Sequence, residues 1–166
     1  KKHGPLVRFK PDASIFSTVD FKWDTIANHL QESAFLMKGV HFVLTDERIN
    51  QVQDFFYENG LREYVGSINA NKNPLTEIVD FSDLDKETNI DVEVALQYCN
   101  EDYNETIYSY VNNVRTRDGG THEVGFRAGI SRAVNDFAEN NKLLKGKKLE
   151  GGDIREGLTA IISLKV

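Results

Sequence analysis

The stretch "NNVRTRDGGTHEVGFR", from Asn112 to Arg127, decides how the chain is interpreted. Three arginines, a Gly-Gly pair and a histidine lie close together in it, between two segments with regular apolar patterns. Four roles are open for such a loop. It could cradle a phosphate, bind a metal ion, contact nucleic acid, or only turn the chain from a strand into a helix.

The composition is that of a globular chain. With 166 residues, 40% of them hydrophobic, the chain has the size of one domain or one and a half small ones. Cys99 is the only cysteine, which excludes an internal disulfide and favours a reducing, cytoplasmic compartment. We expect no signal peptide and no membrane span. The net charge of −6 argues against a protein coated with basic residues for nucleic acid.

The charges are unevenly distributed along the chain. Acidic residues dominate from Glu77 to Glu105, where Lys86 is the only basic residue. Basic residues outnumber acidic ones from Val111 to Lys148; they are Arg115, Arg117, Arg127, Arg132, Lys142, Lys145, Lys147 and Lys148. Two interpretations remain open: a solvated acidic hairpin beside a mildly basic helix, or one basic face that meets a polyanion.

The first sixty or so residues predict a β-α-β arrangement. Residues 6–10 alternate as a strand that ends before Pro11. A helix is expected from Phe21 to about Met37, with Asp20 as its cap, and Gly39 closes it. The segment "VHFVLTDER" then alternates as a second strand.

The rest of the chain predicts a second sheet with a long helix. A short helix is expected around residues 61–68, followed by a hairpin of "LTEIVDFS" and "IDVEVALQYC" and a third strand, "TIYSYVNNV". Thr121 is expected to cap a helix from His122 to about Asn141. Its predicted apolar stripe consists of Val124, Ile130, Val134 and Phe137. A loop, a helical turn and a buried strand are expected at the C-terminal end of the sequence. We place the boundary between the β-α-β part and the second sheet between Tyr57 and Arg62.

The Gly-Gly pair favours a turn over a phosphate cradle. Glycines before a helix allow a phosphate to approach the free N–H groups. However, "RDGGTH" lacks both the Lys-Ser or Lys-Thr pair of a Walker loop and the spacing of a dinucleotide fingerprint. A strand-to-helix turn with positive φ at Gly119 or Gly120 explains the pair on its own.

The histidines and the cysteine predict no metal site. His3, His29, His41 and His122 are scattered, without an i, i+4 pair or a thiol partner. His122 beside Glu123 suggests acid–base chemistry, but adjacent helical residues point in different directions. We expect a hydrogen bond at the helix start from His122. Cys99 is expected to be a small buried hydrophobic residue.

Arg127 is the candidate binding residue. It shares a helix face with Ser131, Asn135 and Ala138, on the side opposite the predicted apolar stripe. An arginine on a face of small residues can reach a phosphate without steric competition. The alternative is an ordinary solvated arginine.

The segment "YSYVNNVRTRDGGTHEVGFRAGISRAVNDFAENN" resembles the signature of type IIA DNA topoisomerase ATPase subunits, the family of the B subunits of gyrase and topoisomerase IV. Further similar pieces follow the family's order: "LVRFKPDASIF", "LQESAFLMKGVHFVLTDER", "FFYENGLREYV", "IDVEVALQY" and "GGDIREGLTAIISLKV". The resemblance covers essentially the whole chain, and "NNVRTRDGGTHEVGF" is closer to topoisomerase IV than to gyrase.

The resemblance implies an α/β fold with two parts. Residues 1–62 resemble the C-terminal portion of a Bergerat-type ATPase domain, a β-α-β remnant. Residues 63–166 resemble the two-layer transducer domain without its C-terminal part, a fold shared with a ribosomal protein that includes a left-handed crossover.

The resemblance also implies what this chain does not carry. The family's catalytic glutamate, Mg-binding asparagine and glycine-rich loops precede the segment present here, and its Gln-Thr-Lys loop follows it. ATP and Mg are therefore expected in the full-length enzyme, and neither cofactor nor ATP hydrolysis in this chain alone. The sequence departs from the family at His3-Gly4-Pro5, where Thr-Gly-Thr is usual, which puts the adenine pocket in doubt.

For function, the resemblance implies a part of an ATP-dependent type II topoisomerase that couples ATP binding and hydrolysis to DNA strand passage. Arg127 matches the family's arginine after Gly-Phe, which lines a DNA cavity. The implied partners are DNA, a DNA-cleaving A-type subunit and a second copy of the B-type chain, with no membrane. The alternatives are a stand-alone nucleic-acid-binding module of similar fold, and a protein-interaction or regulatory fragment.

Overall fold

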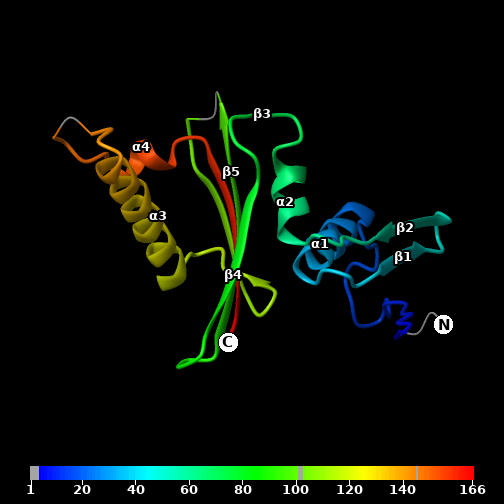
Figure 1. Cartoon of the computed structure of the whole chain (residues 1–166). Helices are drawn as coiled ribbons and strands as arrows, with labels where there is room; N and C mark the ends of the chain where they lie inside the picture. The colour runs from blue at the N-terminus through cyan, green and yellow to red at the C-terminus, as the bar shows by residue number, and fades with distance from the viewer. Residues whose placement is uncertain (1–3, 101–102, 145) are drawn as a thin grey trace.

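The computed structural model of the chain describes residues 4–100, 103–144 and 146–166 (Figure 1). Helices and strands are mixed along it, which confirms the α/β class. The helices are α1 (Trp23–Leu36), α2 (Leu61–Ile68), α3 (Thr121–Asn140) and α4 (Gly151–Arg155). The strands are β1 (Phe42–Asp46), β2 (Gln51–Phe55), β3 (Asn73–Pro74), β4 (Val79–Asp85), β5 (Ile90–Asn100), β6 (Thr106–Val111), β7 (Val114–Arg115) and β8 (Leu158–Lys165).

The N-terminal part consists of α1 packed on a β1–β2 hairpin. Phe55, at the end of β2, is buried together with two alanines of α1. The predicted strand at residues 6–10 is wrong, because an extended segment becomes a strand only with a hydrogen-bonded neighbour and none of the described strands pairs with it. Asp20 does not cap α1, since the helix begins at Trp23 without a side-chain cap.

The larger sheet has the strand order β3-β5-β8-β6-β7, with β4 added on β5. The β4–β5 hairpin, α2 and the buried strand β8 confirm three expectations. Like β2 and β3, the strand β7 was not expected. It forms because Asn112 and Asn113, with φ of 49° and 65°, make the two-residue turn with positive φ that joins antiparallel strands tightly.

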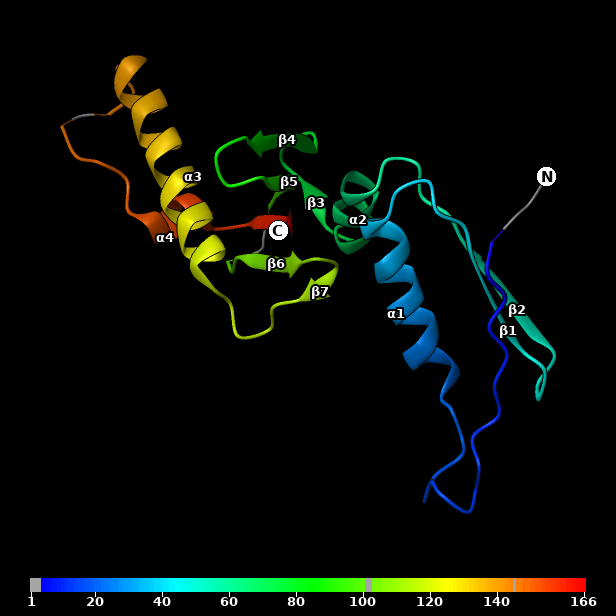
Figure 2. The ribbon, with the colours of Figure 1, turned by 90° about the horizontal axis from the view of Figure 1, so that it is seen from below.

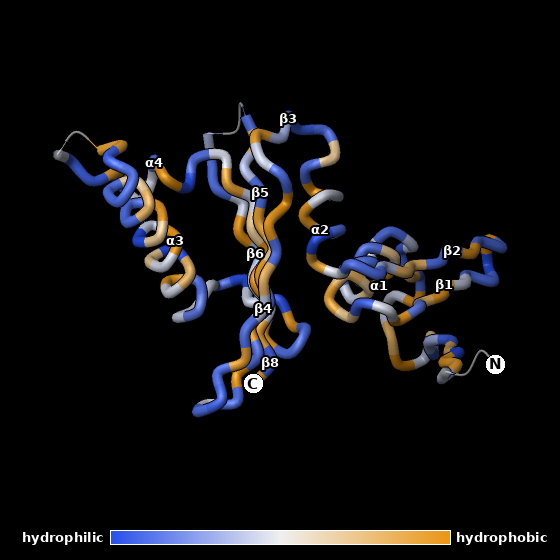
Figure 3. Tube along the Cα trace, viewed as in Figure 1, coloured by the Kyte–Doolittle hydropathy of each residue, from blue (hydrophilic) through white to orange (hydrophobic). Residues whose placement is uncertain are grey.

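The two faces of the larger sheet carry different helices. α2 lies on one face, and α3 lies on the other (Figures 1 and 2). On the α2 side, Ala95 of β5, Tyr110 of β6 and Ile161 of β8 are fully buried against α2. Figure 3 shows apolar residues along the central strands and a hydrophilic β4–β5 turn beyond the helices.

The crossover from β6 to β8 is left-handed. The two strands are parallel, with Thr106 opposite Thr159, so the chain crosses from the end of one to the start of the other through α3 and α4. In Figure 2 both strands run toward the viewer, β8 lies above β6, and α3 lies to the left. A path from β6 through α3 to β8 is then left-handed, whereas crossover connections between parallel strands are nearly always right-handed. The expected left-handed crossover is present.

Stacked aromatic rings join the N-terminal part to the sheet. The ring of Phe35, at the end of α1, lies between Tyr57 and Tyr64. The ring centroids are 3.8 Å apart for Phe35–Tyr57 and 4.6 Å apart for Phe35–Tyr64, with interplanar angles of 22° and 5°. Phe35 is only 3% exposed and belongs to the same apolar cluster as Ala95 and Ile161. The end of α1, through Phe35 and Leu36, is therefore part of the core of the larger sheet.

Replacing Phe35 with alanine is expected to lower the free energy of unfolding by about 3–5 kcal/mol, because the cavity removes two ring contacts from a packed core. Chemical denaturation measures this loss. Phe137→Ala is the matched control, since Phe137 is also helical but 63% exposed, and its effect is expected to stay within about 0.5 kcal/mol. Equal losses in the two variants would contradict the assigned role of the ring stack.

Candidate functional site

The Gly-Gly loop is a turn into α3. Gly119 has a φ of 74°, which confirms the expected positive φ, whereas Gly120 is extended at 162°. Thr121 does not cap the helix: it is already the first residue of α3, and the cap position is Gly120 without a side-chain hydrogen bond. The carboxylate of Glu123 lies over Gly119, 3.6 Å from where a Cβ would be. A negative group therefore occupies the space in which a phosphate would have to bind.

A hydrogen-bonded cluster fixes the start of α3 to the sheet. His122 Nε2 lies 3.0 Å from Thr116 Oγ1, which confirms the expected hydrogen bond of His122 at the helix start. Ser109 of β6 donates its hydroxyl to Glu123 Oε1 at 2.5 Å, and the hydroxyls of Ser109 and Thr116 are also hydrogen-bonded. Glu123 is 9% exposed. Its carboxylate is thus held by partners from the strand and cannot leave without breaking them.

Arg127 lies on the packed side of α3, not on a free face. Its Nε donates to Glu105 Oε1 at 2.8 Å, and its Nη1 donates to Glu123 Oε2 at 3.0 Å. The side chain is 31% exposed. Burial alone would lower the pKa of Arg127, but the hydrogen bonds that it donates to Glu105 and Glu123 outweigh this effect and raise the pKa. Arg127 is therefore a permanently charged group that is already paired.

The expected orientation of α3 is only partly correct: of the predicted apolar stripe, Ile130 and Val134 are half-buried. Val124 and Phe137 of the predicted apolar stripe are 66% and 63% exposed, whereas Asn135 and Ala138 are buried. Small and polar side chains form the packed face because they let other segments approach closely. The Asn135 amide donates to the Leu149 carbonyl at 3.2 Å and accepts from the Leu149 N–H at 2.8 Å. Helical spacing correctly predicted that Arg127 shares a helix face with Ser131, Asn135 and Ala138. It wrongly predicted that this face is free of packing contacts.

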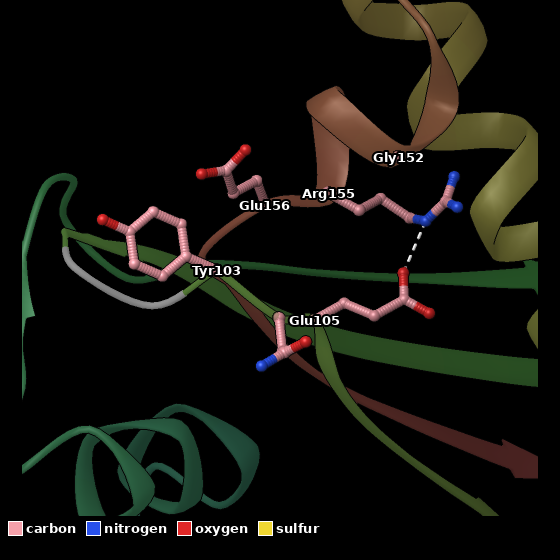
Figure 4. Close-up of a pocket in the computed structure, with 6 residues that line it drawn as sticks. Tyr103, Glu105, Gly152, Arg155 and Glu156 are labelled. Carbon is pink, nitrogen blue, oxygen red and sulfur yellow. Dashed lines mark hydrogen bonds and ion pairs between the residues drawn. The ribbon is translucent and has the colours of Figure 1, made fainter.

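Glu105 bridges two arginines. Its Oε1 accepts from Arg127, and its Oε2 accepts from Nε of Arg155 at 2.5 Å (Figure 4). Burial alone would raise the pKa of Glu105, but hydrogen bonds from Arg127 and Arg155 outweigh it, and the net shift is downward. Neither Glu105 nor Arg155 was singled out in the sequence, since 50 residues separate them. Only the parallel register of β6 and β8, which starts just after each of them, brings them together.

A shallow cavity opens beside this bridge. The residues that line it are Tyr103, Asn104, Glu105, Gly152, Arg155 and Glu156 (Figure 4). Two carboxylates and one guanidinium face it, so its formal charge is negative. Because the Arg127 guanidinium also pairs with Glu105, the cavity with Glu105 in place has no surplus of positive charge to attract an anion such as phosphate.

Among the residues that the structure describes, no group of three or more His, Cys, Asp or Glu side chains is placed to hold a metal ion. Within the same residues, no helix is long and apolar enough to cross a membrane. Cys99 is buried, as expected. His3 of the divergent His3-Gly4-Pro5 and Lys145 of the basic stretch lie outside the described residues, as do two acidic residues at positions 101 and 102.

Three comparisons relate the chain to known proteins. Residues 60–166 match the family model for DNA gyrase B. The B subunit of DNA topoisomerase 4 from Streptococcus pneumoniae is 50% identical over 167 residues, covering 99% of this chain and 25% of that protein. The B subunit of DNA gyrase from Clostridium acetobutylicum is 43% identical, covering 99% of this chain and 26% of that protein. The chain thus spans about a quarter of the length of these relatives.

The fold also matches a solved structure. The 43K ATPase domain of Thermus thermophilus gyrase B, crystallised with an aminocoumarin, superposes with a TM-score of 0.82 at 32% identity. The match covers 95% of this chain and 43% of that domain. Both the N-terminal part and the larger sheet therefore have counterparts within one known structure.

Glu105→Gln is expected to lower the free energy of unfolding at pH 7 by about 1–2 kcal/mol, because it removes charge-assisted hydrogen bonds to two arginines. The pKa of Glu105 is lowered in the folded chain from its usual 4.5. Its contribution is therefore fully present above pH 4.5 and is lost as the pH falls through the lower folded value. Chemical denaturation at a series of pH values from neutral to acidic should show that the difference in the free energy of unfolding between wild type and variant shrinks as the pH falls. A difference that stays constant would rule out ionised Glu105 as its source.

Proposed function

Because the chain belongs to the DNA gyrase B family, we propose that it is part of the B subunit of a type IIA DNA topoisomerase, the part that connects ATP binding to DNA passage. The observation that carries the proposal is the family match over residues 60–166, which includes the whole larger sheet and α3. The higher identity with the B subunit of topoisomerase 4 supports the topoisomerase IV branch. The proposed compartment is the cytoplasm.

In this proposal residues 1–62 are the C-terminal portion of the ATPase domain and residues 63–166 belong to the transducer domain. Two observations support a boundary here. The family match begins at residue 60, and α2, the first helix on the larger sheet, begins at Leu61.

ATP and Mg²⁺ belong to the full-length enzyme in this proposal. The residues described here do not fit them, because the glycine loop before α3 has the Glu123 carboxylate over it. What this chain contributes is a mechanical connection. The Tyr64 and Tyr110 hydroxyls are 2.9 Å apart, and Tyr64 also donates to Glu32 of α1 at 3.3 Å. A displacement of α1 is thereby passed to β6 as a rigid-body shift.

The proposed partners are DNA, a DNA-cleaving A-type subunit and a second copy of the B-type chain. Arg127 is the proposed DNA contact. A guanidinium binds backbone phosphate without reading sequence, as the passage of an arbitrary duplex requires. The chain's net charge of −6 favours a local contact of this kind over a uniformly basic surface. The same acidity, together with the family match, argues against a stand-alone nucleic-acid-binding module.

In the full-length enzyme, Arg127→Gln is expected to reduce DNA-stimulated ATP hydrolysis about five- to tenfold, the cost of one lost charge-assisted contact. Basal hydrolysis should stay nearly unchanged, because Arg127 is remote from ATP in this proposal. Arg8→Gln is the matched control, since Arg8 is also paired with a glutamate, Glu47, but lies in the N-terminal part. Steady-state rates with and without DNA measure both. Equal loss of basal and stimulated rates would count against a DNA contact.

A further inference from the structure

The pairing of Arg127 raises a difficulty for a DNA contact. The four charged side chains of the cluster, Glu105, Glu123, Arg127 and Arg155, are joined by ion pairs of 2.5 to 3.0 Å. Their formal charges cancel. A neutral cluster exerts little attraction on a phosphate, so DNA cannot gain the energy of a free arginine while all three ion pairs persist.

Of the two carboxylates, Glu105 is the one that can be displaced. Glu123 is inside α3, nearly buried, and held by Ser109. Glu105 comes before the first residue of β6, is 29% exposed at its side chain, and follows the exposed Tyr103 and Asn104. Its side chain lines the cavity, so it can rotate toward solvent without breaking a helix or a strand.

The oxygens of Glu105 occupy the position that a phosphate would need. Each Oε accepts from the Nε of a different arginine, so the carboxylate already spans the two guanidiniums. Phosphate oxygens accept from guanidinium groups in the same way, and each phosphate also carries a negative charge. Exchange of the carboxylate for a phosphate would therefore keep both arginines satisfied.

We propose that Glu105 is an internal competitor for DNA: its carboxylate holds Arg127 and Arg155 until a backbone phosphate displaces it. The proposal rests on the DNA contact of Arg127 and adds Arg155 as a second phosphate-binding residue. It assigns to Glu105 the task of lowering DNA affinity, so that a duplex is held weakly enough to pass.

The test measures binding of a fluorescein-labelled DNA duplex to the 166-residue chain by fluorescence anisotropy. Glu105→Gln is expected to bind about three- to tenfold more tightly at about 50 mM salt, with a salt dependence steeper by about one phosphate contact. Glu139→Gln is the control, because it removes the same charge from an exposed position of α3. Its affinity should change less than about twofold.

Two further variants separate this proposal from the one it rests on. Glu105→Gln combined with Arg127→Gln should lose the gain in affinity. One outcome is that Arg127→Gln alone weakens DNA binding while Glu105→Gln raises the affinity for DNA no more than Glu139→Gln does. In that case Glu105 is not a competitor for DNA, but Arg127 remains a DNA contact. If Arg127→Gln alone has no effect, the DNA contact itself is wrong, and the competitor role falls with it.

Glu105→Asp keeps the test informative if the glutamine variant does not fold, which circular dichroism shows. Aspartate keeps the charge but is too short to span both arginines, so its affinity for DNA should lie between wild type and Glu105→Gln. Unchanged affinity in a folded Glu105→Asp would overturn the proposal.

Discussion

The parallel pairing of β6 with β8 is the constraint on which the candidate site depends. Parallel neighbours cannot be joined by a tight turn, so the chain must leave the sheet and return, and α3 and α4 form that path. Parallel strands also begin at the same edge. Glu105 directly precedes β6, and Arg155 lies shortly before β8, so the register of Thr106 opposite Thr159 brings the two together.

The attachment of α3 relies on charged and polar contacts in addition to the buried Ala138 and the half-buried Ile130 and Val134. Its packed face contacts its surroundings through Glu123, Arg127 and Asn135, while Val124 and Phe137 remain exposed. Ion pairs that are partly open to water are weakened by salt and by competing anions, whereas apolar contacts are not screened in this way. A helix held in this way is therefore sensitive to the arrival of a polyanion, and the sensitive residues are the same ones that would bind it.

Local sequence patterns predicted several elements, including β8, whose partner strands are distant in the sequence. The β4–β5 hairpin, α2 and the buried β8 follow from alternation, helical period and turn residues. Residues 6–10 alternate equally well but form no strand, since a strand needs a partner as well as a pattern. Periodicity correctly grouped Arg127 with Ser131 and Asn135. It could not tell which face of α3 packs, because that depends on where α4 and Leu149 lie after folding.

One short strand connects the two sides of the molecule. Ser109 and Tyr110 are consecutive in β6, so their side chains point to opposite faces, and each is 1% exposed. The Ser109 hydroxyl is hydrogen-bonded to Glu123 of α3. The Tyr110 hydroxyl is hydrogen-bonded to Tyr64, whose ring stacks on Phe35 of α1. Neither residue can shift without moving the other, because they share one peptide unit in a packed sheet. In the proposed function, movement of α1 and occupation of the arginine cluster would therefore act on the same strand, which would connect the proposed nucleotide side with the proposed DNA side.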